Sequence, residues 1–230
     1  MINQIKEKML GWGLPENTAS EKLDRYYQML IEKNAVMNLT RITDPADVIT
    51  LHFLDSMALL KMTDISGKRV IDVGSGAGFP GLPLKIAEPG CRITLADSTR
   101  KKVDFIQSVV NELELIGADC VHVRAEEASR LPQYREMFDI AVSRAVARLS
   151  VLCELCLPFV KVGGFFAAYK GPASGTEKPE AEAVIAALGG ALRNDFEYVI
   201  PGTDISHRLV IIDKVSKTPD KYPRKFSKMG

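Results

Sequence analysis

Val70-Ile71-Asp72-Val73-Gly74-Ser75-Gly76-Ala77-Gly78 is the stretch that decides the fold. An apolar run stops at three alternating glycines, and an apolar helical pattern follows them. This pattern predicts a buried strand, a tight glycine turn and the start of a helix. Glycine has no Cβ, so the backbone can turn sharply there and approach a ligand closely. The unpaired N–H groups at the helix start favour polar or anionic groups.

Two nucleotide-like ligands fit such a turn, a dinucleotide and S-adenosyl-L-methionine. Residues 76–81 match the dinucleotide fingerprint G-x-G-x-x-G, and Asp97 follows at about the 20-residue spacing that this fingerprint requires. However, Asp72 lies inside the strand and gives the form D-x-G-x-G-x-G, which is usual for methyltransferase turns. Phe79 and Pro80 also stand where a dinucleotide fold needs small residues. The motif favours S-adenosyl-L-methionine and leaves a dinucleotide-binding oxidoreductase as an alternative.

The composition is that of an ordinary globular protein. The chain has 230 residues, of which 46% are hydrophobic and 26% charged, enough for one large domain with an appendage. The formal net charge is +1, so the chain lacks the overall basic field of many nucleic-acid binders. No apolar run approaches the roughly 20 residues of a membrane span, and the N-terminus lacks the apolar core of a signal peptide. We expect a cytoplasmic protein that does not enter a membrane.

The four cysteines predict neither a metal site nor disulfides. Cys153 and Cys156 form a C-x-x-C pair, but they lie in an apolar helical pattern over residues 149–159. No second C-x-x-C and no pair of spaced histidines completes a tetrahedral zinc set. Disulfides are rare in a reducing compartment. We therefore expect these cysteines to pack in the core, and we expect no metal.

The order of patterns along the chain predicts an α/β fold with a helical N-terminal extension. Residues 1–62 are helical in pattern, with Asp44 and Pro45 placed as the N-cap and first residue of one helix. From Arg69 onward, strand and helix patterns alternate. Strands are predicted at 69–73, 92–96, 120–124, 138–142, 162–169, 194–200 and 207–214, and helices at 80–88, 99–115, 148–158 and 177–189.

Alternation of this kind implies a parallel sheet with helices on both faces. The last two strands are separated by only six residues, which suffices for a hairpin but not for a crossover helix. A mainly parallel seven-strand sheet with an antiparallel last strand resembles the Rossmann-like class I S-adenosylmethionine-dependent methyltransferases. The predicted organisation is a helical N-terminal extension over 1–64, a class I methyltransferase domain over 65–215 and a basic C-terminal tail over 216–230.

Ligands of open α/β sheets bind at the carboxyl ends of the strands, near the switch in strand order. Asp97 ends the second strand, where a carboxylate can accept both ribose hydroxyls; capping of the next helix is the alternative. The adenine ring should lie after the third strand, although Glu126 could simply be an acid in a first helical turn. Arg144 ends the fourth strand, where methyl donor and acceptor would meet; a mere surface cation is the alternative. The predicted cofactor residues are Gly74, Gly76, Gly78, Phe79, Asp97, Ala125, Glu126 and Arg144.

Motifs that the sequence lacks exclude some classes of methyl acceptor. Exocyclic base amines are usually methylated by an Asn/Asp-Pro-Pro-aromatic tetrad after the fourth strand, where this chain has Ser143-Arg144-Ala145-Val146. Methylation at C5 of a pyrimidine needs a cysteine nucleophile, and neither Cys153 nor Cys156 has that setting. An acceptor that is already nucleophilic remains, such as guanine N7, which needs positioning and no general base. A small-molecule methyltransferase is also compatible, and no catalytic acid or base is predicted.

Several segments together resemble the bacterial 16S rRNA guanine-N7 methyltransferase G family, also called glucose-inhibited division protein B. The resemblance covers nearly the whole chain, and the Asn-Leu-Thr and His-Phe-Leu-Asp-Ser segments are specific to that family. It implies methylation of a guanine in the decoding region of 16S rRNA, and cofactor contacts from Gly74, Phe79, Ala125, Glu126 and Arg144. The matching segments are 37–40 with Ile42, 52–56, 72–81 with Pro83, 124–126, 143–146, 170–171 and 222–225.

The remaining motifs suggest where the small ribosomal subunit would bind a monomeric enzyme. Residues 214–230 hold six Lys or Arg residues against the single acid Asp220, so we expect this tail to contact RNA phosphates, apart from the glycine turn. Alternatives are hydrogen bonds between packed helices for His52 and Asp55, a plain surface lysine for Lys170, and a tail that packs back on the domain. The predicted substrate residues are Asn38, Arg41, His52, Asp55, Lys170, Arg224 and Lys225.

Overall fold

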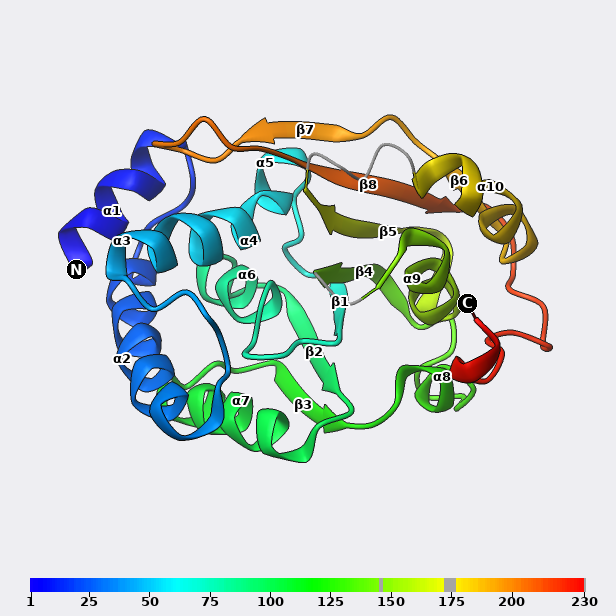
Figure 1. Ribbon diagram of the computed structural model, residues 1–230, viewed down its shortest axis with the longest axis horizontal. Helices are drawn as coiled ribbons and strands as arrows, with labels where there is room; N and C mark the ends of the chain where they lie inside the picture. The colour runs from blue at the N-terminus through cyan, green and yellow to red at the C-terminus, as the bar shows by residue number, and fades with distance from the viewer. Residues whose placement is uncertain (145–146, 172–176, 230) are drawn as a thin grey trace.

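The computed structural model describes residues 1–144, 147–171 and 177–229. Over these residues the chain forms one twisted sheet with helices on both sides (Figure 1). The strands follow the order β3-β2-β1-β4-β5-β8-β6, and β7 also pairs with β8. Their bounds are β1 Arg69–Val73, β2 Arg92–Asp97, β3 Ala118–His122, β4 Phe138–Arg144, β5 Val160–Lys170, β6 Gly190–Leu192, β7 Phe196–Val199 and β8 Ser206–Lys214.

Helices precede the sheet and connect its strands. The predicted helix start at Asp44 is confirmed, because its side chain accepts hydrogen bonds from the amides of Ala46 and Asp47. The helices are α1 Ile2–Gly11, α2 Ala19–Met37, α3 Pro45–Asp47, α4 Asp55–Met57, α5 Leu59–Met62, α6 Gly81–Ala87, α7 Arg100–Glu112, α8 Ala125–Ala128, α9 Leu149–Cys156 and α10 Glu177–Ala187. A π-helical segment, Val48–Leu54, joins α3 to α4, and 3-10 turns lie at Leu157–Phe159 and Phe226–Lys228.

The predicted fold class is confirmed in its parallel core and antiparallel end. Strands β1 to β5 pair in parallel, whereas β8 runs antiparallel to β5. The described sheet has eight strands rather than the predicted seven. The extra strand, β6, pairs with 212–214 of β8, and β7 pairs with 206–209, so both lie along the same strand. A three-residue strand next to Gly189 and Gly190 carries too little pattern to be predicted from sequence.

The third strand begins and ends two residues earlier than predicted. It covers Ala118–His122 instead of 120–124. Residues 123 and 124 therefore leave the sheet and enter the connection to α8. This shift matters for function, because the connection lies at the carboxyl edge of the sheet, where ligands bind in this class of fold.

Two hydrophobic clusters cover the two faces of the sheet. Val70 points into a cluster that includes Tyr26 of α2 and Phe53 of the π-helical segment, whereas Ile71 and Val73 point into the other. That second cluster is built with residues of α9 and α10. Figure 1 shows α2, α4 and α6 on one side of the sheet and α9 and α10 on the other. The N-terminal helices thus share a core with the sheet, while the domain limits at 64 and 215 stay predictions.

The glycine turn needs glycine for two separate reasons. Gly74, Gly76 and Gly78 have φ values of +77°, +60° and +108°, a region that side chains with a Cβ rarely adopt. A Cβ on Gly78 would also lie 2.4 Å from Leu82 Cδ1 and 2.8 Å from the Tyr26 hydroxyl. At Gly81 it would lie 2.3 Å from Leu95 Cδ2. The turn therefore packs closely against the body of the protein at Gly78 and Gly81.

The Asp72 side chain anchors the glycine turn by a buried hydrogen bond. Its Oδ2 accepts a hydrogen bond from the Gly81 amide at 2.9 Å, and the residue is fully buried. Burial raises the pKa of the Asp72 carboxyl to about 7, against the lowering effects of the Gly81 hydrogen bond and the Arg144 charge. Asp72 thus links the end of β1 to the start of α6.

Asp72→Asn tests this buried carboxyl. A pKa raised to about 7 in the folded protein, against about 3.9 when unfolded, favours folding most below pH 4, and this contribution disappears as the pH rises to 7. The free energy of unfolding of Asp72→Asn should therefore rise relative to wild type between pH 4 and 7, by about 2–4 kcal/mol, and stay level above. The side-chain amide introduced by this substitution has no partner for its N–H groups. It therefore also changes the free energy of unfolding by an amount that does not depend on pH.

Urea unfolding at steps from pH 4 to pH 8 measures this difference. The matched control is Asp119→Asn, because Asp119 is exposed on β3. Its difference from wild type should stay nearly flat over the same range. A flat difference for Asp72→Asn as well would mean that this carboxyl has the same pKa in the folded and unfolded chain.

Candidate active site

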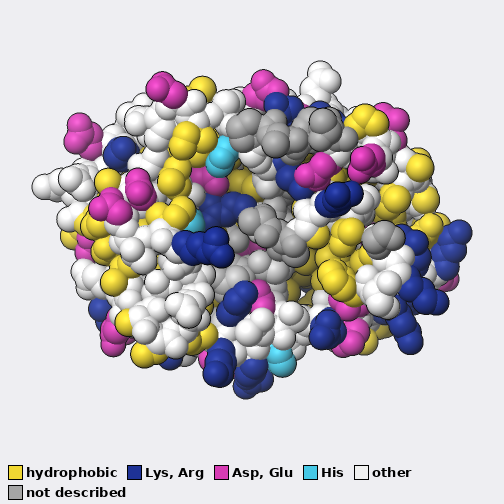
Figure 2. Space-filling model, viewed as in Figure 1, with side chains coloured by type: hydrophobic (Ala, Val, Ile, Leu, Met, Phe, Trp, Pro, Cys, Tyr) yellow, Lys and Arg dark blue, Asp and Glu magenta, His cyan; other side chains and the backbone are white. Residues whose placement is uncertain are grey.

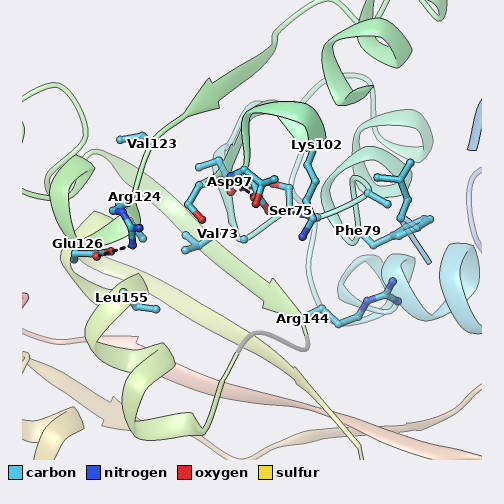
Figure 3. Close-up of a pocket in the computed structure, with 18 of the residues that line it drawn as sticks. Val73, Ser75, Phe79, Asp97, Lys102, Val123, Arg124, Glu126, Arg144 and Leu155 are labelled. Carbon is cyan, nitrogen blue, oxygen red and sulfur yellow. Dashed lines mark hydrogen bonds and ion pairs between the residues drawn. The ribbon is translucent and has the colours of Figure 1, made fainter. Parts of the chain in front are cut away.

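A cavity of about 600 Å³ opens at the carboxyl ends of β1 to β4. It forms the hollow near the centre of the face in Figure 2. Of the predicted cofactor residues, all but Gly78 line it; Gly78 is turned inward between Leu82 and Tyr26. Figure 3 shows Val123, Glu126 and Leu155 at one end of this cavity and Phe79 and Arg144 at the other.

The amides of the glycine turn are bonded within the protein. Gly74 and Ser75 donate to the Ala96 carbonyl, and Gly76 donates to Asp97. At the start of α6, Gly81 donates to Asp72 and Leu82 donates to the Gly78 carbonyl. A dinucleotide turn instead presents such groups to a pyrophosphate. The Asp72 carboxyl stands at the helix start, so this geometry disfavours the dinucleotide alternative.

Asp97 joins the glycine turn to the next helix. Its Oδ2 accepts from the Gly76 amide at 2.9 Å, and its Oδ1 accepts from the Thr99 amide at 2.8 Å. The N-cap residue of α7 is Thr99 and not Asp97, so Asp97 orders the connection before the helix without capping it. The residue is 6% exposed and lines the cavity. Each carboxylate oxygen has a second lone pair with which it can accept a ligand hydroxyl.

The end of the cavity near α8 is mainly apolar. Ala125 and Glu126 form the first turn of α8, as the sequence suggested, and Val123 and Leu155 face the same space. The Glu126 carboxylate is 3.8 Å from Arg124 Nη1 and is 15% exposed. Sequence reasoning missed Val123, Leu155 and Phe226 here. Leu155 could only have been found from its place beside Glu154 on an apolar helix, and the motifs gave no signal for Phe226.

At the other end, Arg144 is held by groups from the N-terminal segment. Its Nη1 donates to Asp55 Oδ2 at 2.8 Å and to the Leu51 carbonyl at 3.2 Å. Its Nη2 lies 3.2 Å from His52 Nδ1, and its guanidinium carbon is 5.1 Å from the centre of the Phe79 ring. The side chain is only 14% exposed. His52, Asp55 and Arg144, which the sequence predicted separately, therefore form one cluster.

The contacts of His52 fix its protonation state. Arginine only donates hydrogen bonds, so Nδ1 of His52 must accept from Arg144, and the proton sits on Nε2, which donates to Thr40 Oγ1 at 2.8 Å. Burial and the Arg144 charge lower the pKa of His52 to about 4. The ring also stacks on Phe79 with centroids 4.4 Å apart. His52 is therefore neutral, with both ring nitrogens engaged.

Asp55 is bonded on its other oxygen as well. Its Oδ1 accepts from the Tyr198 hydroxyl at 2.7 Å and from His207 Nδ1 at 2.8 Å. These donors and the Arg144 charge hold the pKa of the Asp55 carboxyl below its usual value, although burial alone would raise it. Tyr198 and His207 come from the β7–β8 hairpin and were not predicted from sequence. The cluster thus joins the N-terminal segment, β4 and the far edge of the sheet.

The other predicted substrate residues lie at several places around the molecule. Asn38 ends α2 in a left-handed conformation and, like Arg41, is exposed beside Leu39 and Thr40, which line the cavity. Lys170 is not a plain surface lysine: it donates to Glu177 at 2.8 Å and to the Ala147 carbonyl at 3.0 Å. Ala145 and Val146, which the sequence placed after the fourth strand, lie outside the described residues.

The two tail residues predicted to bind RNA have different surroundings. Arg224 forms an ion pair with the buried Glu154, and Lys225 is exposed. Neither lines the cavity, but Phe226 beside them does. The chain after β8 folds back onto α8 and α9, as in the alternative of a tail that packs on the domain. That its cations stay apart from the glycine turn remains a prediction.

The cysteines of the C-x-x-C pair are fully buried in α9. Burial raises the pKa of both Cys153 and Cys156 well above the usual thiol value. Within residues 1–144, 147–171 and 177–229, no three His, Cys, Asp or Glu side chains gather in a way that could hold a metal ion. None of the helices in the same residues is long and apolar enough to cross a bilayer.

Known relatives match almost the whole chain. The family model described as rRNA small subunit methyltransferase G matches residues 19–195. A protein named ribosomal RNA small subunit methyltransferase G from Alkaliphilus oremlandii is 48% identical over 226 residues, which cover 97% of this chain and 95% of the relative. One of the same name from Lachnoclostridium phytofermentans is 48% identical over 94% of this chain and 90% of its own length.

Solved structures that are more distant in sequence share the fold. A SAM-dependent methyltransferase from Aquifex aeolicus matches with a TM-score of 0.53 at 19% identity, covering 76% of this chain and 96% of that chain. M. jannaschii TYW2, solved in complex with AdoMet, matches with a TM-score of 0.51 at 12% identity over 69% of this chain and 73% of that chain. The family match and the 48% identical relatives lead to one conclusion: this chain belongs to the rRNA small subunit methyltransferase G family.

Proposed function

We propose that the protein transfers a methyl group from S-adenosyl-L-methionine to N7 of a guanine in 16S rRNA of the small ribosomal subunit. Family membership supports the enzyme class, since the relatives are named for the small-subunit rRNA. The observation that carries the acceptor is the cluster around Arg144, in which His52 and Asp55 are both fully engaged. An acceptor without a proton to lose fits a site in which these two side chains are already bonded.

The cavity has the groups that this cofactor requires. The cofactor supplies an electrophilic methyl group on a sulfonium. Asp97 would accept hydrogen bonds from the ribose hydroxyls. Gly74 and Gly76 line the cavity without a Cβ, so they would let the backbone approach the methionine part. Val123 and Ala125 would form an apolar wall for the adenine, near Glu126. The nearly buried guanidinium of Arg144 keeps two N–H groups beyond its described bonds, and these would hold the methionine carboxylate.

Catalysis at such a site depends on how the methyl donor and acceptor are positioned. Guanine N7 carries a lone pair, so its attack needs in-line alignment and a dry surrounding rather than proton transfer. Asp55 fixes Arg144, and Tyr198 and His207 fix Asp55, so the end of the cavity near β4 is rigid before any ligand binds. Hydrogen bonds already in place do not have to be reorganised during the reaction.

Cations at the mouth of the cavity are placed to bind RNA phosphates. Lys102 and Arg124 line the cavity, and Arg41 is exposed beside it. Figure 2 shows dark blue side chains around the hollow on this face. We propose that Asn38, Arg41 and Lys225 contact the RNA, and that His52, Asp55, Lys170 and Arg224 act by shaping the protein. A cytoplasmic monomer completes the proposal, and sedimentation of the purified protein would measure the monomeric state.

Asp97→Ala should weaken S-adenosyl-L-methionine binding. Loss of charge-assisted hydrogen bonds costs roughly 1.5–3 kcal/mol each, so the affinity should fall about tenfold or more. Isothermal titration with the pure cofactor measures this. The control is Asp104→Ala on α7, because its carboxylate is 60% exposed and pairs only with Arg100 in the described contacts. A folded Asp97→Ala protein with wild-type affinity would mean that the ribose is bound elsewhere.

Arg144→Lys should lower the methylation rate even though the charge is kept. An ammonium is a point charge and cannot reproduce the fork that contacts Asp55, Leu51 and His52 together. Two weakened charge-assisted hydrogen bonds predict a fall of about tenfold or more in kcat/KM. Arg148→Lys serves as the control, because its side chain is 80% exposed. An equal rate for both variants would remove Arg144 from the mechanism.

Identification of the methylated nucleotide tests which atom accepts the methyl group. The protein should methylate 16S rRNA or small subunits in the presence of S-adenosyl-L-methionine, and digestion followed by mass spectrometry should find N7-methylguanine. N2-methylguanine or 5-methylcytosine would contradict the acceptor assignment but not the fold. Methylation of a metabolite in the absence of RNA would favour a small-molecule methyltransferase. Titration with NAD in place of the cofactor should show no binding.

A further inference from the structure

The chain after β8 is firmly attached to the body of the protein. We call residues 216–229 the C-terminal strap. It begins beside Lys214, whose buried ammonium is 3.1 Å from the Glu136 carboxylate and donates to the Leu157 carbonyl at 2.9 Å. The Thr218 amide donates to the same Glu136 carboxylate at 2.8 Å. The first residues of the strap are therefore part of the fold and not a free tail.

Two arginines in the connection after α8 bind carbonyl groups along the strap. Arg135 donates to the carbonyls of Thr218 at 2.8 Å and Tyr222 at 3.1 Å. Arg130 donates to the carbonyls of Lys221 and Pro223. The backbone of the strap thus follows a fixed path over the region between α8 and α9.

An ion pair in α9 fixes the strap next to the cavity. The Glu154 carboxylate is 1% exposed and accepts from three groups of Arg224. These are the backbone amide at 2.6 Å, Nε at 3.0 Å from each carboxylate oxygen, and Nη2 at 2.7 Å. A carboxylate is rarely buried to this degree unless it is paired. The next residue of α9, Leu155, lines the cavity. The ion pair therefore places the strap beside the apolar end of the site.

Phe226 lies between two anchors of the strap. Arg224 holds it on one side, and Met229, which is 5% exposed and belongs to the cluster beneath α9, holds it on the other. The Phe226 side chain is left 53% exposed, yet it lines the same cavity as Leu155 and Ala125. In Figure 1 the turn that carries it, drawn in red, lies beside α8 and α9. An aromatic ring held half exposed over a cavity can cover a flat ligand.

We infer that Phe226 forms a wall of the cofactor site and packs against the adenine ring of the bound nucleoside. This inference rests on the proposed function for the identity of the cofactor. The adenine would lie between β3 and α9, and Phe226 closes that end of the cavity. Base–aromatic contacts of this kind are favourable whichever base is present, because each base has a flat face. The strap thus serves the cofactor, whereas its exposed cations Lys221, Lys225 and Lys228 remain open to RNA.

Phe226→Ala tests the wall, and Phe226→Tyr keeps the ring. Because the side chain is half exposed, its removal leaves the anchors at Arg224 and Met229 in place, and a melting curve verifies folding. Binding of S-adenosyl-L-methionine, S-adenosylhomocysteine and adenosine is measured by isothermal titration. Loss of a base–aromatic contact should weaken all three by about the same factor, between about fivefold and a hundredfold. Phe226→Tyr should restore binding to within about twofold of wild type, because the ring that stacks on the base is kept.

Ser227→Ala is the matched control, since its exposed side chain lies in the same turn, and its affinities should equal those of wild type. Unchanged affinity of Phe226→Ala for all three ligands would overturn the inference. So would a change confined to the KM for rRNA, which would place the ring on the RNA side. If wild type binds none of the three ligands, the proposed function fails. If wild type binds them and Asp97→Ala weakens binding while Phe226→Ala does not, only the strap inference fails.

Discussion

The close approach of the glycine turn to the protein body is the constraint on which the rest of the site depends. Gly78 and Gly81 lie where a Cβ would collide with Tyr26, Leu82 or Leu95. The backbone groups brought inside by this approach need partners, because a buried amide without one costs free energy. Asp72 takes the Gly81 amide and Asp97 takes the Gly76 amide. Tyr26 donates from α2 to the Ala77 carbonyl, so the N-terminal helices are part of the same arrangement.

The polar groups around Arg144, at one end of the cavity, are also all hydrogen-bonded to one another. Arg144 is a nearly buried cation, and the cost of removing it from water is offset by Asp55, the Leu51 carbonyl and His52. Asp55 in turn is satisfied by Tyr198 and His207. In this network both ring nitrogens of His52 and both carboxylate oxygens of Asp55 are already bonded. The network fixes a positive charge and an aromatic ring at one end of a cavity. This fits a reaction that needs alignment more than acid–base chemistry.

The N-terminal helical segment and the C-terminal strap complete the walls of the cavity. Leu39 and Thr40, which follow α2, line it on the side of Arg144, and Phe226 lines it on the side of α8. The central sheet supplies the glycine turn and Asp97. The segments outside the sheet therefore decide the shape of both ends. A relative with the same sheet and different terminal segments would have a cavity closed in another way.

The sequence by itself determined the fold class, the glycine turn and, among the eight predicted cofactor residues, seven that line the cavity. Patterns in neighbouring residues carry this information, because strand, turn and helix follow from local periodicity and from glycine, and the carboxyl ends of parallel strands meet at one edge. Even so, β6 and the start of β3 were misjudged, since three-residue strands and strand ends carry little periodic signal.

Only the tertiary structure decided how these residues are connected. Asp55 meets Arg144 across 89 positions and His207 across 152, and Glu154 meets Arg224 across 70. Nothing local in a sequence reports such pairs, because they exist only after the sheet, the N-terminal helices and the strap have packed together. For the same reason the charge of the last residues suggested an RNA-binding tail, whereas burial and pairing make Lys214 and Arg224 structural and place Phe226 at the cavity.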